Sequence, residues 1–217
     1  MTTDGSIRLC AVRAADSGAR LLLELSHCEE AQTRKETLCV FAKRLQRVPV
    51  VGPVSPDTYA NFLHEAAVCE AVTLGLRLLA YGALSRVRLI QKLRARGLTA
   101  AAASEAADLL VSDGFLNESE GALSCARADL AKLWGDKRIL ADLAAKGFDR
   151  VALNAVKEML SAENSQKRCA KLIQKRRMRL PRDEAEAARF AAALMRYGYS
   201  VSEMKAAFEI LSRCNGK

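Results

Sequence analysis

Hydrophobic positions follow two different patterns along the chain, and the change falls near residue 55. In the first part, residues 6–14 and 20–26 predict two short strands, and the sequence between them, residues 16–18, favours a turn. Residues 35–47 carry four apolar side chains at helical spacing and so predict a short helix. We therefore expect an N-terminal extension, residues 1–54, built from a β-hairpin and a short helix.

From residue 55 onward the pattern is helical. Ser55 is a suitable N-cap residue, and Pro56 directly after it fits the first helical position. Apolar side chains follow on one stripe, so a helix is predicted from Pro56 to about Tyr81.

A short sequence pattern then recurs three times. Gly97, Gly147 and Gly198 lie 50 and 51 residues apart, and the leucine four positions before each glycine recurs as well. A further leucine stands thirteen residues after each glycine, at positions 110, 160 and 211. Apolar positions that recur in register indicate a duplicated structural unit. In each copy the glycine is predicted to end a helix with positive φ. The polar residues Thr99, Asp149 and Ser200 are predicted to cap the next helix.

These patterns predict a mainly α protein with three tandem three-helix repeats in an elongated, curved stack behind the small N-terminal extension. The repeats are expected at residues 55–116, 117–162 and 163–217. A single unit of this size buries too little surface to be stable alone, whereas stacked units share their buried faces. The alternative is one irregular helical bundle whose segments resemble each other by chance.

Composition narrows the function classes. The chain has 217 residues and a net charge of +9, which favours an acidic or polyanionic partner. Its seven cysteines are scattered, which fits reduced thiols in the cytoplasm better than a disulfide framework. The first five residues do not resemble a signal peptide, and no apolar stretch is long enough for a membrane span. We expect a cytoplasmic monomer that needs no metal or cofactor.

The sequence lacks the motifs of the common catalytic sites. It has no G-x-x-x-x-G-K-[ST] phosphate-binding loop, and residues 121–124 have the wrong spacing for a nucleophile elbow. We therefore expect a protein without catalytic turnover.

Basic residues are concentrated in the third repeat. Residues 164–182 hold eight basic side chains and no acid, and a helix over residues 163–179 would place Arg168, Lys171, Lys175 and Arg179 on one stripe. Such a stripe suits a phosphate backbone or an acidic protein surface, although a merely solvated face is the alternative. The candidate binding residues are Lys167, Arg168, Lys171, Lys175, Arg176, Arg179 and Arg182 in the third repeat, Arg86, Arg88, Lys92, Arg94 and Arg96 in the first, and Arg127, Lys132, Lys137 and Arg138 in the second.

Four sequence stretches resemble the RecX family of regulatory proteins. They are residues 80–86 with Leu89, Leu93 and Gly97, residues 113–118, residues 134–147, and residues 196–200. The resemblance covers about residues 70–211. The chain departs from it at Asn117, where the family usually has an acid, and at Gly121, where it has an aromatic residue.

The resemblance implies a role in DNA recombination, DNA repair and the SOS response. RecX proteins modulate, and chiefly inhibit, the RecA recombinase by binding along or within its nucleoprotein filament. A RecA-type filament is thus the expected partner, and the basic residues are expected to contact its protein or the phosphates of single- or double-stranded DNA. Two alternatives stay open on the residues alone: a sequence-independent nucleic-acid-binding module, and a helical-repeat adaptor for an acidic protein.

Overall fold

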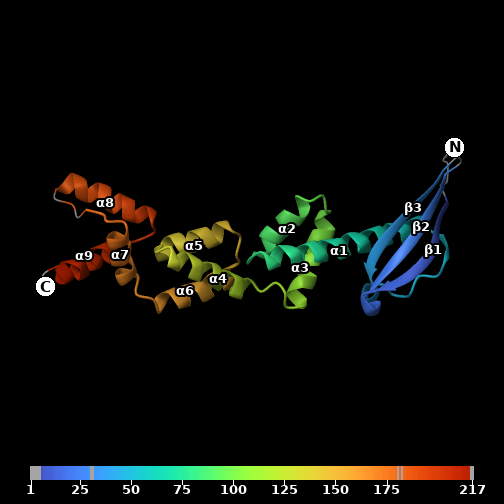
Figure 1. Cartoon of the computed structure of the whole chain (residues 1–217), viewed down its shortest axis with the longest axis horizontal. Coiled ribbons are helices and arrows are strands. Elements are labelled where there is room, and N and C mark those ends of the chain that lie inside the picture. Colours follow the sequence, from blue (N-terminus) through green and yellow to red (C-terminus); the bar gives the residue numbers. More distant parts are fainter. Residues whose placement is uncertain (1–5, 30–31, 180, 182, 216–217) are drawn as a thin grey trace. The chain divides into compact units, whose positions relative to one another are not determined.

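The computed structural model describes residues 6–29, 32–179, 181 and 183–215 (Figure 1). The chain divides into two compact units. The first holds Met1–Tyr81 and Leu89–Phe115, and the second holds Gly82–Arg88 and Leu116–Lys217.

Four strands form an antiparallel sheet within the described part of the first unit, in the order β3-β2-β1-β4. Their bounds are Ser6–Ala15 for β1, Arg20–Glu29 for β2, Gln32–Phe41 for β3 and Gly52–Val54 for β4. Alternate residues of β2, among them Leu21, Leu23 and Leu25, are buried, as expected when one face of a strand packs on a core. The predicted hairpin is confirmed, and both of its strands are longer than predicted.

The predicted helix over residues 35–47 is wrong. Most of this segment belongs to β3, which pairs with β2 over ten residues, and only Ala42–Arg44 form a short 3-10 helix, η2. Val40 lies opposite Leu21 and Leu38 opposite Leu23, so β3 adds its own apolar side chains next to those of β2. Pairing with the free edge of β2 satisfies the backbone groups of β3 that face β2, and this long-range gain outweighs the helical spacing of the segment.

The first unit also contains most of the first helix triplet. Helix α1 spans Pro56–Ala80, and the side chain of Ser55 accepts a hydrogen bond from the Thr58 N–H, so the predicted helix start is confirmed. Helix α1 packs against both β3 and α3. The other two helices of the triplet are α2, Arg86–Arg94, and α3, Ala100–Ser112.

The second unit contains two further triplets, each with its own apolar core. Their bounds are Glu118–Ala131 for α4, Asp136–Ala145 for α5, Arg150–Ser161 for α6, Ser165–Lys175 for α7, Glu184–Arg196 for α8 and Val201–Asn215 for α9. Helix α4 packs on α6 and α7 packs on α9, just as α1 packs on α3. The fold class is confirmed as mainly α with an N-terminal sheet, whereas the boundaries of the repeats stay a prediction.

The glycines of the repeated pattern adopt the predicted backbone conformation. Gly97, Gly147 and Gly198 have φ values of +89°, +78° and +93°. This left-handed conformation lets the chain leave one helix and present a hydrophobic residue to the core. Phe148 and Tyr199, which follow two of these glycines, are both buried. The predicted caps Thr99 and Asp149 accept hydrogen bonds from the N–H groups of Ala102 and Ala152, respectively.

Two hydrogen bonds inside the second unit are formed at equivalent positions of the repeated pattern. The Ser85 hydroxyl donates to the Lys146 carbonyl at 2.6 Å, and the Gly135 N–H donates to the Tyr197 carbonyl at 2.7 Å. Each acceptor directly precedes a glycine with positive φ, and each donor lies just before the middle helix of the preceding triplet. Successive repeats are therefore joined by bonds to the loop that the glycine makes.

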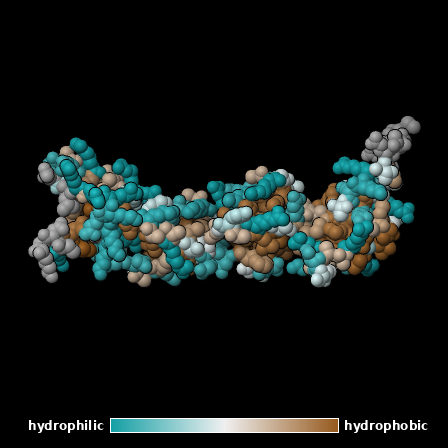
Figure 2. Space-filling model, viewed as in Figure 1, coloured by the Kyte–Doolittle hydropathy of each residue, from teal (hydrophilic) through white to brown (hydrophobic). Residues whose placement is uncertain are grey.

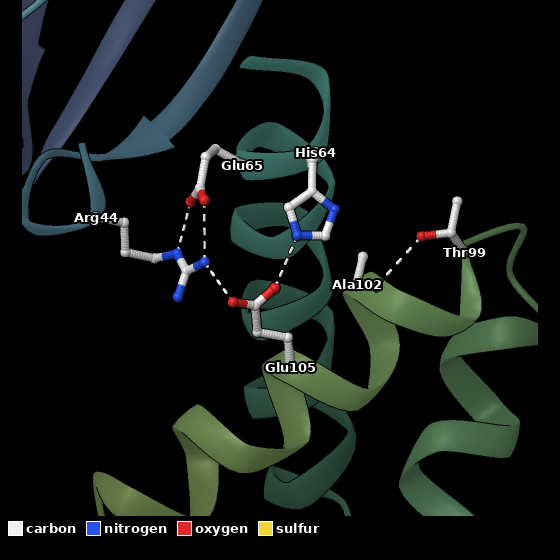
Figure 3. Close-up of polar contacts among 6 residues, drawn as sticks. All are labelled: Arg44, His64, Glu65, Thr99, Ala102 and Glu105. Atoms are coloured by element: carbon white, nitrogen blue, oxygen red, sulfur yellow. Dashed lines mark hydrogen bonds and ion pairs between the residues drawn. The ribbon is translucent and has the colours of Figure 1, made fainter. Parts of the chain in front are cut away.

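A polar network ties the sheet to two helices within the first unit (Figure 3). Arg44, in η2, donates two hydrogen bonds to Glu65 of α1 at 2.6 and 3.0 Å and one to Glu105 of α3 at 2.6 Å. His64 of α1 contacts the other oxygen of Glu105 at 2.8 Å. Glu65 is buried, so the bidentate pairing with Arg44 offsets the cost of removing its charge from water.

The network predicts an acid-sensitive first unit. Hydrogen bonding from Arg44 lowers the pKa of Glu105, with a smaller contribution from His64. A carboxyl whose pKa is lower in the folded chain than in the unfolded chain stabilises the fold at pH values above its unfolded pKa of about 4.3. That contribution is lost as the pH falls through the pKa of the folded chain. We expect Glu105→Gln to weaken the first unit at pH 7 and to change it little in strong acid, as measured by urea unfolding at both pH values. An equal loss at both pH values would contradict this.

Candidate partner-binding surface

Helix α7 carries most of the basic residues that the sequence singled out. Lys167, Lys171 and Lys175 are exposed on it, and Arg176 and Arg179 are exposed just after it. We call these five residues the α7 basic surface. On the face shown in Figure 2, hydrophilic residues cover the part of the second unit that contains α7. Arg182, also predicted to belong to this surface, lies outside the described residues.

The prediction that Arg168 lies on the exposed stripe is wrong. Its side chain is only 7% exposed, forms an ion pair with Asp136 and donates from Nε to the carbonyl of Trp134 at 2.9 Å. A buried guanidinium with these two partners links the start of α5 to α7. Arg168 is therefore a structural residue, and its cost of burial is offset by charge-assisted hydrogen bonds.

The predicted helix over residues 163–179 is also too long. Helix α7 ends at Lys175, and Arg177 has a φ of +49°, while the Met178 N–H donates to the Ile173 carbonyl. This left-handed residue closes the helix end and redirects the chain. Arg179 therefore does not continue the helical stripe, whereas Lys171 and Lys175 remain one turn apart on it.

Two aromatic rings join the basic residues of the second and third repeats. The Arg138 guanidinium lies 3.9 Å from the centre of the Trp134 ring and 5.7 Å from that of Tyr197. Lys132 Nζ lies 4.8 Å from the Trp134 ring, and the Arg176 guanidinium lies 6.0 Å from the Tyr197 ring. Cations within about 6 Å of a ring are attracted by the negative charge of its face. We call these five residues the cation–aromatic cluster.

Two of the three cations in this cluster, Arg138 and Lys132, are held by further polar contacts. Arg138 donates to the carbonyl of Arg196 at 3.1 Å, and Lys132 pairs with Asp129 at 2.7 Å. Asp129 is buried, whereas the Lys132 side chain is 56% exposed and keeps its charge at the surface. The three cations are among the binding residues that the sequence predicts, whereas Trp134 and Tyr197 are not. The signal available in the sequence was that each aromatic directly precedes a glycine: Trp134 precedes Gly135, and Tyr197 precedes Gly198 of the repeated pattern.

The other predicted basic residues are spread over α2, α4 and α5. Arg88, Lys92, Arg94 and Arg96 are exposed, and the N–H of half-buried Arg86 donates to Glu118 at 2.5 Å. Residues 86–88 belong to the second unit and residues 92–96 to the first, so a continuous basic track through all repeats stays a prediction.

Two basic residues of the second repeat have different surroundings. Arg127 pairs with Glu120 at 3.4 Å, with both side chains well exposed, so this ion pair contributes little stability. Lys137 is exposed near the start of α5. Both residues keep the candidate binding role that the sequence predicts.

Neither a cluster of metal-ligating side chains nor a membrane-spanning helix is found among the described residues. None of them form a group of three or more His, Cys, Asp or Glu side chains suited to a metal ion. Judged by length and hydropathy, none of the described helices could span a membrane. The candidate surface presents cations and aromatic rings, the groups that attract anions by charge and planar groups by stacking in other proteins.

Comparisons with known proteins identify the fold. No family model matches the sequence, and no curated protein matches it significantly. The crystal structure of regulatory protein RecX aligns with 94% of this chain and 99% of its own, with a TM-score of 0.70 and 16% identity. RecX from Lactobacillus salivarius aligns with 67% of this chain and 97% of its own, with a TM-score of 0.57 and 19% identity. The chain therefore has the fold of the RecX proteins, mainly helical with a small N-terminal sheet.

Proposed function

We propose that this chain is a RecX-type regulator that binds a RecA-type recombinase filament and inhibits or modulates it. The observation that carries this proposal is the fold, which matches the regulatory protein RecX over nearly the full length of both chains. The sequence motifs at residues 80–86 and 134–147 support the same assignment independently of the fold. We place the activity in the cytoplasm, where the recombinase acts on DNA.

The α7 basic surface is the proposed contact region. Residues 164–182 contain no acid, so their positive charge is not neutralised along the sequence. A cluster of exposed cations attracts phosphates and acidic side chains and accelerates association at low salt. Either the DNA or the acidic groups of the recombinase would then complete the interface.

A second candidate function is sequence-independent binding of nucleic acid by the chain alone. The cation–aromatic cluster favours it, because cations that contact phosphates and rings that stack on bases are the usual components of a single-strand site. Helix α3, with Glu105 and Asp108, is too acidic to read bases in a groove.

The decisive experiment follows ATP hydrolysis by a RecA-type recombinase on single-stranded DNA while the chain is added. A filament regulator is expected to slow hydrolysis at amounts well below one chain per recombinase. A module that only binds DNA is expected to act only when it covers the DNA, and to bind bare DNA equally well without recombinase.

The α7 basic surface is tested by replacing Lys171, Lys175 and Arg179 with alanine together. These side chains are exposed, so the free energy of unfolding should change by no more than about 0.5 kcal/mol for each. If they bind phosphates, the slope of log affinity against log salt should fall by about 0.7–0.9 for each phosphate that is no longer neutralised. If they bind acidic protein groups, inhibition of the filament should weaken while binding to bare DNA stays unchanged.

A matched control removes the same charge elsewhere. Arg150, Lys157 and Lys205 are exposed on α6 and α9, outside the proposed surface. Their triple alanine variant should bind and inhibit almost like the parent. Equal behaviour of the two triple variants in melting, DNA binding and inhibition would remove the α7 basic surface from the interface.

A further inference from the structure

A groove runs between the sheet and α1 in the first unit, and two thiols line it. The groove has a volume of about 600 Å³, and its walls include residues 37–39 of β3 and residues 63–77 of α1. Cys39 and Cys69 face each other there, and both are free thiols. The filament-binding proposal uses neither residue.

The two sulfur atoms are already in contact. The Cys39 Sγ lies 3.8 Å from the Cys69 Sγ, although the residues are 30 positions apart in the sequence. A disulfide bond needs about 2.05 Å between the sulfurs, so closure requires a movement of under about 2 Å. Strand β3 and helix α1 pack directly on each other, which holds the two thiols at this separation.

The surroundings make the two thiols unequal. Cys69 is only 2% exposed, and burial raises its pKa to about 12, so it stays a thiol at neutral pH. Cys39 is partly exposed at the edge strand and is the thiol that a small reagent in the groove reaches first. An accessible thiol next to a second, shielded thiol is the arrangement of a reacting and a resolving cysteine.

We propose that Cys39 and Cys69 are a peroxide-sensitive pair that closes reversibly into a disulfide between β3 and α1. The Cys39 sulfur attacks one oxygen of hydrogen peroxide, the O–O bond breaks, and one water leaves with the thiol proton. The Cys69 sulfur then attacks the sulfenic acid on Cys39, the S–O bond breaks, and the Cys69 proton leaves with the hydroxyl as a second water. Two thiols are oxidised to one disulfide, and one peroxide is reduced to two waters.

The disulfide would fasten the N-terminal sheet to the long helix of the first repeat. It would close a loop of about 30 residues in the unfolded chain and so raise the melting temperature of the first unit, by on the order of 5–10 °C. Cys10 and Cys28, which are exposed, would be oxidised without this effect.

The test treats the reduced full-length chain with hydrogen peroxide, blocks the remaining thiols and maps tryptic peptides without reduction. Cys39 lies in the peptide of residues 36–43 and Cys69 in that of residues 48–77, and each of these peptides holds one cysteine. We expect these two peptides to appear as one cross-linked species that dithiothreitol separates, together with the rise in melting temperature. If both cysteines are recovered as blocked thiols while Cys10 and Cys28 are oxidised, the proposal is wrong.

Variants separate the two roles. Cys69→Ser should stop the reaction at a Cys39 sulfenic acid that dimedone traps, whereas Cys39→Ser should leave Cys69 reduced. Cys125→Ser, which changes a half-buried thiol in the second unit, should form the cross-link as the parent does. Dimedone labelling of Cys69 in the Cys39→Ser variant at the rate of the parent's cross-linking would overturn the assigned order.

Discussion

Replacing Gly198 with alanine is expected to destabilise the second unit by about 3 kcal/mol, the sum of a backbone and a packing penalty. Its φ is +93°, a conformation that costs an alanine about 1–2 kcal/mol. An added Cβ would also lie 2.5 Å from the backbone nitrogen of Arg138 and 2.9 Å from the carbonyl oxygen of Gly135. Backbone atoms cannot rotate away, so the junction between the second and third repeats must open.

The repeated pattern supplies the matched control. Gly97 holds the same place in the first repeat, with a φ of +89°, and an added Cβ there meets nothing within 4 Å. Gly97→Ala should therefore show only the backbone penalty of about 1–2 kcal/mol. Gly147 is intermediate, because its added Cβ would lie 3.2 Å from the Val87 side chain. Urea unfolding of the three alanine variants should rank Gly198 as the largest loss, and equal losses would refute the packing argument.

The Arg168→Met variant is expected to lose about 3 kcal/mol of stability, because the buried partner of an ion pair is removed and the half-buried Asp136 is left behind. Asp136 would lose its counterion, and the Trp134 carbonyl would lose its donor. Lys171→Met, on the exposed face of the same helix, should change the free energy of unfolding by no more than about 0.5 kcal/mol. Chemical denaturation of both variants measures the contrast.

Replacing Asp136 as well tests whether its unpaired carboxylate causes the loss of stability in Arg168→Met. Burial raises the pKa of Asp136 even with Arg168 beside it, and Arg168 opposes this rise. In Arg168→Met we expect the pKa of Asp136 to rise further. The folded state then binds a proton more tightly than the unfolded state, so this variant should regain stability as the pH falls through the raised pKa. Adding Asp136→Asn should recover part of the loss at neutral pH. A double variant whose loss equals the sum of the single losses would show that the two residues do not act as a pair.

Local sequence rules predicted the parts of the fold that depend on neighbouring residues. The helix start at Ser55 and the left-handed turns at Gly97, Gly147 and Gly198 each follow from a few adjacent side chains. Strand β3 did not follow, because its apolar spacing suits a helix until β2 offers a pairing edge. Single-residue propensity contains no information about that edge.

The candidate surface shows the same limit. The run of cations in residues 164–182 indicated a basic region, and most of its described members are exposed. Nothing in the run distinguishes Arg168, whose partners Asp136 and Trp134 lie more than 30 residues earlier. Tyr197 was missed for the same reason, since its contact with Arg138 depends on how two repeats pack within the second unit. The contact of Trp134 with Arg138 is local, four residues along the chain, and only the position of Tyr197 beside the same cation makes the cluster visible.

The hydrogen bond from the Gly135 N–H to the Tyr197 carbonyl joins main chain to main chain, whereas the corresponding bond at Ser85 depends on one replaceable hydroxyl. Beside the side-chain bonds of Arg138 and Arg168, one contact between the second and third repeats is therefore made by main-chain atoms alone, provided that glycine is kept at 135 and 198. Exposed positions that make no bond across this junction are free to diverge over evolution without removing that contact. Selection for a new partner could thus change the chemistry of this surface while its geometry stays constant.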